Sequence, residues 1–419
     1  MSQDGVFDLR VATLNCWGLH APFSKDRKIR IQKLAQELAK GKFDIIALQE
    51  IWVYDDFEQI KTCIQDVIKY SHYFHSGFIG SGVCVYSRFP IESALMHRYS
   101  LNGFAHHIHR GDWFGGKVVG LAQLGVRIDT RTIRLNFYTT HIHAEYDRVN
   151  DLYLPHRVVQ SFEMSQFVKH TSAGADLVIL TGDLNLEPID LGFRMVLCNS
   201  KLCDAYERAE SRPSTDDHLG NTCDRPDNVY TDATVLESVP DGKRIDYILY
   251  RAMNGLQCSV KSCGVCLNVV PDAPNLCYSD HAGVTAEFAL QFDSTDGKQD
   301  AAPQPSISPS QEAAELRSML DEGVRLVELG ERRVLSDFKL FLGSSVILLF
   351  VFVLTIDIEL SYPAVAMPAI FCRFILTIVV GFCFWYGVIG LKLEGKALKA
   401  AKAGMTLLRE ALVEFGTES

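Results

Sequence analysis

A set of polar residues stands at the ends of short apolar runs, where a strand would deliver a side chain to the edge of a sheet: Asn15, Glu50, Asp183, Asn185, Asp246 and His281. Carboxylate and carboxamide oxygens are the ligands that a hard cation such as Mg²⁺ prefers, and a histidine can take a proton from water. We therefore expect these side chains to converge on one site, in which His281 is the base.

Glu50 and Asn15 are the expected metal ligands. Glu50 ends an apolar run, so its carboxylate either forms a salt bridge or holds a hard cation, and the oxygen of Asn15 suits Mg²⁺ or its water shell. Asp183 and Asn185 are two residues apart, which puts both side chains on one face of an extended chain. An Asx-turn closed by Pro188 is the other interpretation of that pair.

The remaining polar residues bear on the base and on the choice of metal. A buried Asp246 would be costly without a partner, and orienting His281 is the simplest way to satisfy it. His141 and His143 share one face of a strand end, which invites zinc. No third nitrogen or sulfur ligand follows at short spacing, so the pattern favours magnesium over zinc.

Composition excludes some classes of function. The chain of 419 residues has a formal net charge of −10, which argues against a protein that holds nucleic acid by neutralising phosphates. Its start, MSQDGVFDLR, has no apolar core and predicts no secretory signal. We therefore expect the 12 cysteines to stay reduced in the cytosol as small buried apolar residues.

Strand-like and helix-like segments alternate in the first part of the chain. Residues 7–14 and 43–48 are typical of strands, and residues 57–68 and 152–170 are typical of amphipathic helices. The run at 43–48 is apolar almost throughout, as expected of a strand buried on both faces. We predict an α+β fold, a two-sheet sandwich with helices outside, that forms one catalytic domain over residues 1–292.

Beyond this domain the composition changes. Residues 293–310 are rich in Asp, Pro, Ser, Gln and Ala and predict a flexible linker. Ser308, with Pro309 after it, is typical of the start of a helix. The pattern favours about equally three locations for the helix expected over residues 311–336: on the membrane surface, against the catalytic domain, or in solvent as a spacer. Its apolar stripe consists of Leu316, Leu320, Val324 and Val327.

Two apolar stretches follow that exceed the needs of a soluble core. Residues 340–356 and 374–391 contain no charge, and each spans roughly 26 Å at ~1.5 Å per residue, near the thickness of a bilayer core. We predict a membrane hairpin over residues 337–392, with helices at about 338–356 and 374–391. Lys and Arg flank it on both sides, so the catalytic domain and a tail over residues 393–419 are expected in the cytosol. Two buried soluble helices are the alternative, but no further domain remains to bury them.

The order of the motifs resembles a known superfamily. The sequences LNCWG, LQE, TH, GDLN, RIDY and SDH follow one another up to His281, as in the endonuclease/exonuclease/phosphatase superfamily of Mg²⁺-dependent phosphodiesterases. The stretch HRGDWFGGK, with IGSGVCV before it and THIHAEY after it, is similar to the neutral sphingomyelinases. A two-span anchor after the catalytic domain also resembles that family, and the resemblance covers nearly the whole chain except the linker.

The resemblance implies a role for each residue at the centre of the site. Glu50 would bind Mg²⁺ with the assistance of Asn15. His281 would activate water, with Asp246 and Asp280 supporting it.

The resemblance also implies roles around the phosphate. His141 and Asn185 would contact the phosphate, with Asp183 beside them. Asp112 and Lys117, at the two ends of the DWFGGK loop, match a pair that controls the active conformation in that family.

The chemistry of the glycines and aromatic residues of this loop indicates contacts that they could make with the substrate. Gly115 and Gly116 would let the backbone approach a phosphate, and Trp113 and Phe114 offer an apolar or cation–π surface to a choline. A simple turn is the alternative.

The implied reaction is hydrolysis of sphingomyelin at a membrane surface to ceramide and phosphocholine, with Mg²⁺ as cofactor and with sphingomyelin and other choline lipids as partners. A choline lysophospholipid, such as lyso platelet-activating factor, is the nearest rival substrate. A nuclease needs a basic groove, and an inositol lipid phosphatase needs cationic side chains that the loop PDAPNLCYSD before His281 lacks. An inactive membrane tether fits the anchor but not the intact motifs. We expect a multi-pass protein of the plasma membrane or endoplasmic reticulum.

Overall fold

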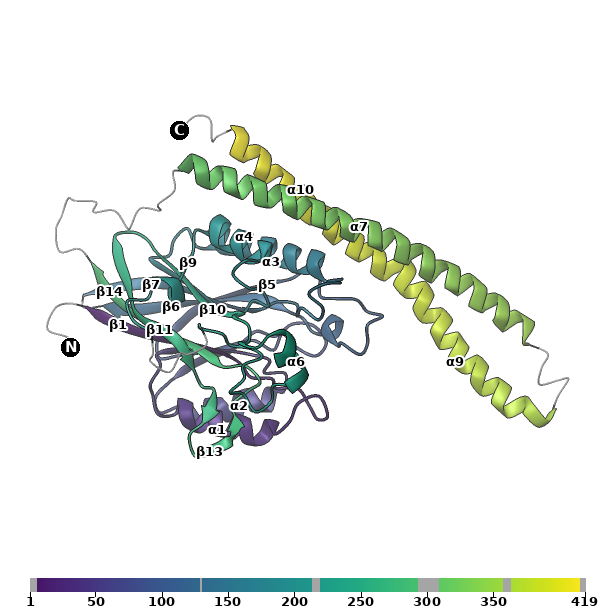
Figure 1. Cartoon of the computed structure of the whole chain (residues 1–419), viewed down its shortest axis with the longest axis horizontal. Coiled ribbons are helices and arrows are strands. Elements are labelled where there is room, and N and C mark those ends of the chain that lie inside the picture. Colours follow the sequence, from purple (N-terminus) through teal and green to yellow (C-terminus); the bar gives the residue numbers. More distant parts are fainter. Residues whose placement is uncertain (1–5, 129, 213–218, 293–308, 357–362, 415–419) are drawn as a thin grey trace.

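Two six-stranded sheets pack face to face, with helices on their outer faces, in the computed structural model of this chain (Figure 1). The structure describes residues 6–128, 130–212, 219–292, 309–356 and 363–414. The α+β sandwich predicted from the sequence is confirmed.

The first sheet consists of β1 (Phe7–Asn15), β2 (Ile45–Gln49), β3 (Tyr70–Tyr73), β4 (Cys84–Ser87), β11 (Leu256–Cys266) and β14 (Gly283–Phe292). Its strand order is β11-β14-β1-β2-β4-β3. β1 and β2 are parallel, whereas their other neighbours run antiparallel to them. The carboxyl ends of β1 and β2 therefore meet at one edge of the sheet, where Asn15 pairs with Gln49.

The second sheet consists of β5 (Ile91–Arg98), β6 (Val118–Ile128), β7 (Arg131–His141), β8 (Leu177–Asp183), β9 (Cys203–Asp204) and β10 (Asp246–Ala252). Its order is β5-β6-β7-β8-β10-β9. β7 and β8 are parallel, so His141 and Asp183 stand side by side at their carboxyl ends, and Asp246 at the start of antiparallel β10 pairs with Asp183. The strands β12 (Val269–Val270) and β13 (Ala273–Cys277) form a separate small ribbon.

Apolar side chains fill three layers of the domain. Between the sheets, Val11, Ile45, Phe137 and Ile179 belong to one buried cluster. The helices α1 (Arg27–Leu38) and α2 (Tyr54–Ile64) cover the first sheet, and α3 (Leu154–Thr171) and α4 (Leu191–Ser200) cover the second (Figure 1). Two short helices, α5 (Ala205–Arg208) and α6 (Ala233–Ser238), lie in the connections before β10.

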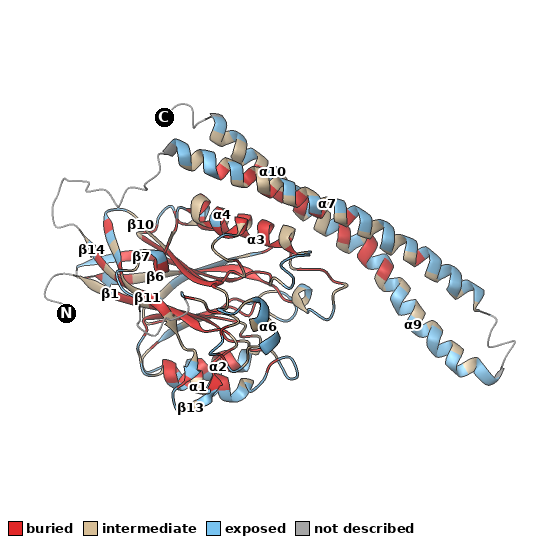
Figure 2. Cartoon of the chain, in the orientation of Figure 1, coloured by how far each residue is buried: buried red, intermediate tan, exposed pale blue. Residues whose placement is uncertain are grey.

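Two long helical segments follow the domain and run side by side (Figure 1). The first is α7 (Pro309–Leu354), and the second consists of a 3₁₀ turn (Pro363–Val365), α9 (Ala366–Trp385), a π-helical turn (Tyr386–Gly390) and α10 (Leu391–Glu414). Both are long and apolar enough to cross a membrane by length and composition. Their far halves are largely exposed, whereas the halves near the domain carry buried residues (Figure 2).

The domain-proximal part of this pair packs on α3 and α4. We call it the stem, meaning residues 309–339 of α7 together with α10. Phe104 of the domain stacks under the Arg333 guanidinium at 4.0 Å, and His156 Nε2 of α3 lies 3.4 Å from Glu394 Oε1 of α10. The apolar cluster between domain and stem includes Val158, Val159, Phe162, Met195, Leu316, Leu320, Val327, Leu398 and Met405.

The C-terminal part differs in detail from the sequence-based division. The helix expected at 311–336 and the first expected span form one continuous helix, and its apolar stripe faces the domain. The tail expected at 393–419 is helical as far as Glu414. The predicted linker up to residue 308, including the cap residue Ser308, lies outside the described residues.

Candidate active site

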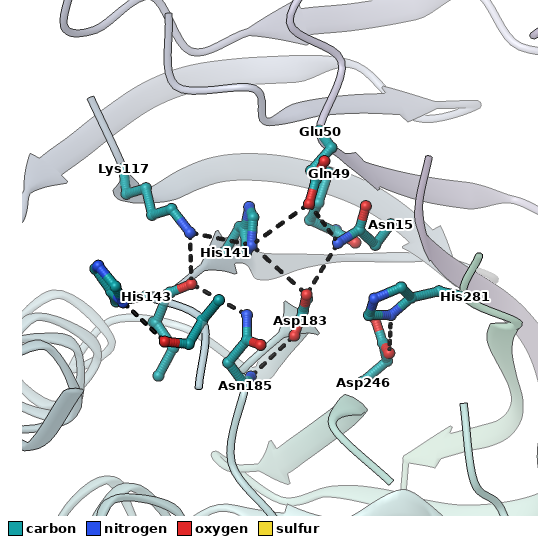
Figure 3. A network of polar contacts seen from close by, with 12 residues as sticks. Asn15, Gln49, Glu50, Lys117, His141, His143, Asp183, Asn185, Asp246 and His281 are labelled. Carbon is teal, nitrogen blue, oxygen red and sulfur yellow. Dashed lines mark hydrogen bonds and ion pairs between the residues drawn. The ribbon is translucent and has the colours of Figure 1, made fainter. Parts of the chain in front are cut away.

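The strand ends bring the predicted residues together in one group, in which Asn15, Asp183, Asp246 and His281 are buried and Glu50 and Asn185 are half-buried (Figure 3). Glu50 directly follows β2 and Asn185 lies two residues beyond the end of β8. Both have positive φ angles, 56° for Glu50 and 44° for Asn185. Such backbone conformations cost about 1–3 kcal/mol for a residue other than glycine and cluster at functional sites. The chain therefore turns sharply at the two points where it presents these side chains.

Asn15 links the two sheets through its amide group. Its Nδ2 donates to Glu50 Oε1 at 3.0 Å and to Asp183 Oδ2 at 2.9 Å. Its Oδ1 accepts the backbone N–H of Trp17 at 3.0 Å. Asn15 therefore bridges two carboxylates through its amide nitrogen, and its Oδ1, which accepts one hydrogen bond, keeps a second lone pair for a cation.

Asp183 and Asn185 form the turn that was the structural alternative for this pair. Asp183 Oδ1 accepts the backbone N–H of Asn185 at 2.9 Å, as in an Asx-turn. This turn leaves Asp183 Oδ2 facing Asn15 and His141, and the Asn185 side chain donates to Ile142 O at 3.2 Å. The turn and a functional role are compatible, because the turn is what directs both side chains.

His281 has the carboxylate partner that the sequence predicted. Its Nδ1 lies 2.9 Å from Asp246 Oδ2, and Thr222 Oγ1 donates to the same oxygen at 2.6 Å. Cys223 forms a backbone bridge with His281. Asp246 thus fixes the Nδ1 side of the imidazole, and the bridge to Cys223 fixes the backbone that carries it.

Asp280 lies beside this pair but is not the partner of His281 Nδ1. Its Oδ1 accepts from Ser279 Oγ at 3.0 Å, and burial raises the pKa of Asp280 against the opposing effects of His281, Ser279 and Arg30. Arg30 is fully buried and donates to the backbone oxygens of Cys16 and Trp17. Asp280 therefore adds a negative charge next to His281, on the loop that carries it.

A second network surrounds Lys117, which is 2% exposed. Its Nζ lies 3.4 Å from Asp112 Oδ1 and donates to Ile142 O at 2.8 Å and to His141 Nε2 at 3.2 Å. Asp112 Oδ2 accepts from Tyr146 at 2.5 Å and lies 3.7 Å from His143 Nε2. The predicted loop pair is therefore joined to the catalytic group through His141.

The DWFGGK loop contacts other protein groups with its glycines and its tryptophan. A Cβ atom added to Gly116 would lie 2.3 Å from the backbone nitrogen of Gly77, so the two backbones touch. Gly116 N donates to Gly80 O at 2.8 Å. The ring of Trp113 lies 5.8 Å from that of Trp385 in α9. The close backbone approach that the glycines permit is therefore made to a neighbouring loop.

Too few cationic groups lie near Glu50 and Asp183 to balance the negative charge of their carboxylates. Burial and the Asp280 charge raise the pKa of Glu50. Burial and the neighbouring Asp246 raise the pKa of Asp183 to about 7. Burial also acts on Asp112, but Lys117 and His143 outweigh it and lower the pKa of that group. The Glu50–Asp183 region is thus the part of the site that a cation would stabilise most.

The histidines divide into two kinds. Burial and the Lys117 charge hold the pKa of His141 well below its ordinary value, and burial lowers the pKa of His143 to about 3. Burial also disfavours a charged His281, but Cys223 and Asp246 favour it, and the pKa of His281 is raised well above its ordinary value. His281 is therefore the histidine of the site that takes up a proton most readily.

The donor set fits a hard divalent cation. Ligand atoms of Asp183, Asp246 and His281 lie within 4.8 Å of one another. Asp246 Oδ1 is buried and has no hydrogen-bond partner among the described residues, and Glu50 adds a further carboxylate next to Asp183. Oxygen-rich sites of this kind suit Mg²⁺.

Sequence reasoning missed several residues of this site. Thr222, Cys223 and Tyr146 sit in loops whose composition gives no hint of their contacts. Arg30 did leave a signal, because it lies four residues before Leu34, on the apolar face of α1, where a charged residue needs buried acceptors.

Residues 12–281 match the Endonuclease/Exonuclease/phosphatase family. The chain belongs to this family. A "Putative neutral sphingomyelinase" of Caenorhabditis elegans is 48% identical over 409 residues, which cover 94% of this chain and 89% of that protein. Sphingomyelin phosphodiesterase 2 of Homo sapiens is 44% identical over 255 residues, which cover 61% of this chain and 58% of that protein. The resemblance to neutral sphingomyelinases is confirmed.

Some relatives of this chain are named for a lipid with another headgroup. The Inositol phosphosphingolipids phospholipase C of Schizosaccharomyces pombe is 32% identical over 70% of this chain and 71% of that protein. Among solved structures, an endonuclease/exonuclease/phosphatase family protein from Bacteroides thetaiotaomicron aligns with a TM-score of 0.51 at 19% identity, covering 71% of this chain and 99% of that one. This likeness supports the fold alone.

Proposed function

We propose that the protein hydrolyses sphingomyelin at a membrane surface, in a Mg²⁺-dependent phospholipase C-type reaction that yields ceramide and phosphocholine. The observation that carries the proposal is the buried His281–Asp246 pair, which lies beside buried Asp183 and half-buried Glu50. The relatives named sphingomyelinase or sphingomyelin phosphodiesterase, at 48% and 44% identity, support the choice of substrate.

His281 acts as the base in this proposal. Asp246 fixes the Nδ1 side of the ring, so Nε2 takes the proton of the attacking water. The positive charge that His281 gains is then balanced by Asp246. In this proposal the phosphate is contacted by Asn185 and His141, which both lie next to Asp183 (Figure 3).

Glu50 and Asp183 hold the cation, and Asn15 positions both carboxylates through its amide group. A Mg²⁺ ion held by these two carboxylates would supply positive charge against the negative phosphodiester, which would otherwise repel the attacking oxygen. Because like charges disfavour each other, a cation in this place also favours the neutral form of His281, which is the form that a base needs.

The membrane anchor is the hairpin formed by α9 and by the half of α7 that lies far from the domain. Cationic residues lie on the domain side of both helices, which supports a cytosolic domain and a cytosolic C-terminus, at the plasma membrane or the endoplasmic reticulum. Two of these cationic residues also form contacts within the chain. Arg333 donates to Leu152 O at 3.3 Å, and Lys402 lies 2.7 Å from Glu331.

The nearest alternative substrate is a choline lysophospholipid such as lyso platelet-activating factor, because it has the same headgroup. The test is to supply the full chain with sphingomyelin, with lyso platelet-activating factor and with an inositol phosphosphingolipid in mixed micelles with Mg²⁺, and to identify the products by mass spectrometry. We expect phosphocholine and ceramide from sphingomyelin at the highest kcat/KM. Absence of ceramide, or a higher kcat/KM for either other lipid, would overturn the choice of substrate.

A further inference from the structure

A polar cleft of about 70 Å³ opens beside Asn185. In Figure 3, Asn185 lies on the far side of Asp183 from Glu50, so the cleft extends the site on the side opposite the proposed cation. Cys223, the neighbour of His281, forms part of the same wall. A substituent on a phosphate held at Asn185 would therefore lie next to the cleft, since Asn185 is part of its lining.

The charged residues of the cleft carry a net negative charge. Four carboxylates face two cationic groups, which leaves two formal negative charges: Glu145, Glu187, Asp190 and Asp224 against Arg148 and Lys243. A cleft with this balance attracts a cation and repels an anion.

Two of the four carboxylates are already neutralised. Arg148 lies 2.8 Å from Asp190 Oδ1 and 2.8 Å from Glu145 Oε2. Arg157, behind the cleft, adds a contact of 3.3 Å to Glu145. These groups form a closed network that shapes the cleft.

Glu187 and Asp224 are the carboxylates with spare capacity. Glu187 Oε1 is 3.5 Å from Arg148, and Asp224 Oδ2 is 3.9 Å from Lys243, so both ion pairs are longer than the 2.8 Å contacts of Asp190 and Glu145. Within the described part of the chain, neither side chain takes part in a hydrogen bond. They are 33% and 29% exposed, so a ligand can reach them.

We propose that this cleft is the subsite for the ammonium end of the lipid headgroup, with Glu187 and Asp224 as its counter-charges. The proposal rests on the proposed function and adds to it the chemical class that the site selects. In phosphocholine and phosphoethanolamine, two carbon atoms separate the phosphate ester oxygen from a positively charged nitrogen, whereas an inositol ring is larger and uncharged. The ring of Trp113, the other candidate for choline, lies against Trp385.

The proposal is tested by calorimetric titration of the full chain, in detergent micelles with Mg²⁺, with phosphocholine, phosphoethanolamine and methyl phosphate. All three have the same phosphate, so the ratio of their Kd values isolates the ammonium group. Each carboxylate should contribute about threefold to tenfold, the size of a partly solvated charge pair. Phosphocholine or phosphoethanolamine should therefore bind at least about tenfold tighter than methyl phosphate, and the tighter of the two identifies the headgroup.

Charge-neutral substitutions provide the controls. Glu187→Gln and Asp224→Asn should each reduce the Kd ratio by about threefold or more. Asparagine tolerates the φ of 54° at position 224, so the backbone is preserved. Lys243→Met, which removes a competing cation, should change the ratio in the opposite direction. Glu237→Gln, the same change on exposed α6, should leave it unaltered.

Three results would overturn the subsite. One is equal binding of phosphocholine, phosphoethanolamine and methyl phosphate, and another is a ratio that neither Glu187→Gln nor Asp224→Asn changes. Tighter binding of inositol phosphate would also overturn it. A parallel assay of sphingomyelin hydrolysis separates the two proposals: an ammonium preference without hydrolysis contradicts the function, and hydrolysis without the preference contradicts the subsite.

Discussion

Replacing Gly323 by leucine should separate the stem from the catalytic domain. A Cβ atom added to Gly323 would lie 3.1 Å from Met405 Sδ of α10, 3.2 Å from Met195 Cε of α4 and 3.6 Å from Val158 Cγ1 of α3. Alanine fits if the methionine ends shift, and it gains about 1 kcal/mol of helix propensity. The further carbons of leucine have no space, and overpacking of this kind costs about 1–3 kcal/mol.

Amide hydrogen exchange of the full chain in micelles measures this effect. Helix α3 lies under the stem, so a loss of about 1–3 kcal/mol should speed exchange of its most protected amides by roughly 5- to 150-fold. Gly343→Leu is the matched control, because an added Cβ at Gly343 in the same helix meets no atom within 4 Å. Equal exchange of α3 in the two variants would refute the docking of the stem on the domain.

Two further predictions concern the buried charges. Lys117→Met should destabilise the fold by about 3–5 kcal/mol, because it leaves Asp112 buried without its cation, and Asp112→Asn in the same chain should restore much of that loss in urea unfolding; additive losses would contradict the coupling. Burial lowers the pKa of His143 to about 3 from its ordinary 6.5, so between these values the unfolded state binds a proton that the folded state does not. The free energy of unfolding should therefore decrease as the pH is lowered from 6.5 towards 3, by up to about 1.4 kcal/mol per pH unit. In His143→Gln this acid sensitivity should shrink, and an unchanged pH profile would show that His143 is not its source.

The sequence was sufficient to predict how the site is assembled. Asn15, Glu50 and Asp183 each end or follow an apolar run, and parallel pairing of β1 with β2 and of β7 with β8 brings such ends to one edge. What the sequence could not give was the direction of each polar atom. Asn15 turns its oxygen to Trp17 because a backbone donor lies within reach, a contact that depends on the local turn.

The docking of the stem shows a second limit. The apolar stripe with Leu316 and Leu320 was visible, but a stripe alone does not identify its partner. The partner surface, around Phe162 of α3, is formed by an ordinary amphipathic helix. Gly323 and Gly404 permit the close approach, since a Cβ at Gly404 would lie 3.0 Å from Phe162, yet in sequence a glycine within a helix indicates only reduced helix propensity.

The central claim is that Glu50 binds the cation while His281 activates water. It is tested most directly by measuring Mg²⁺ binding and sphingomyelin hydrolysis on the same preparations of the wild type, Glu50→Gln and His281→Ala. His281→Ala should still bind Mg²⁺ but lose about 10²–10⁴ in turnover, whereas Glu50→Gln should bind Mg²⁺ more weakly and regain part of its turnover as Mg²⁺ is raised. Near-normal turnover in folded His281→Ala, or hydrolysis that persists in excess chelator, would contradict this account.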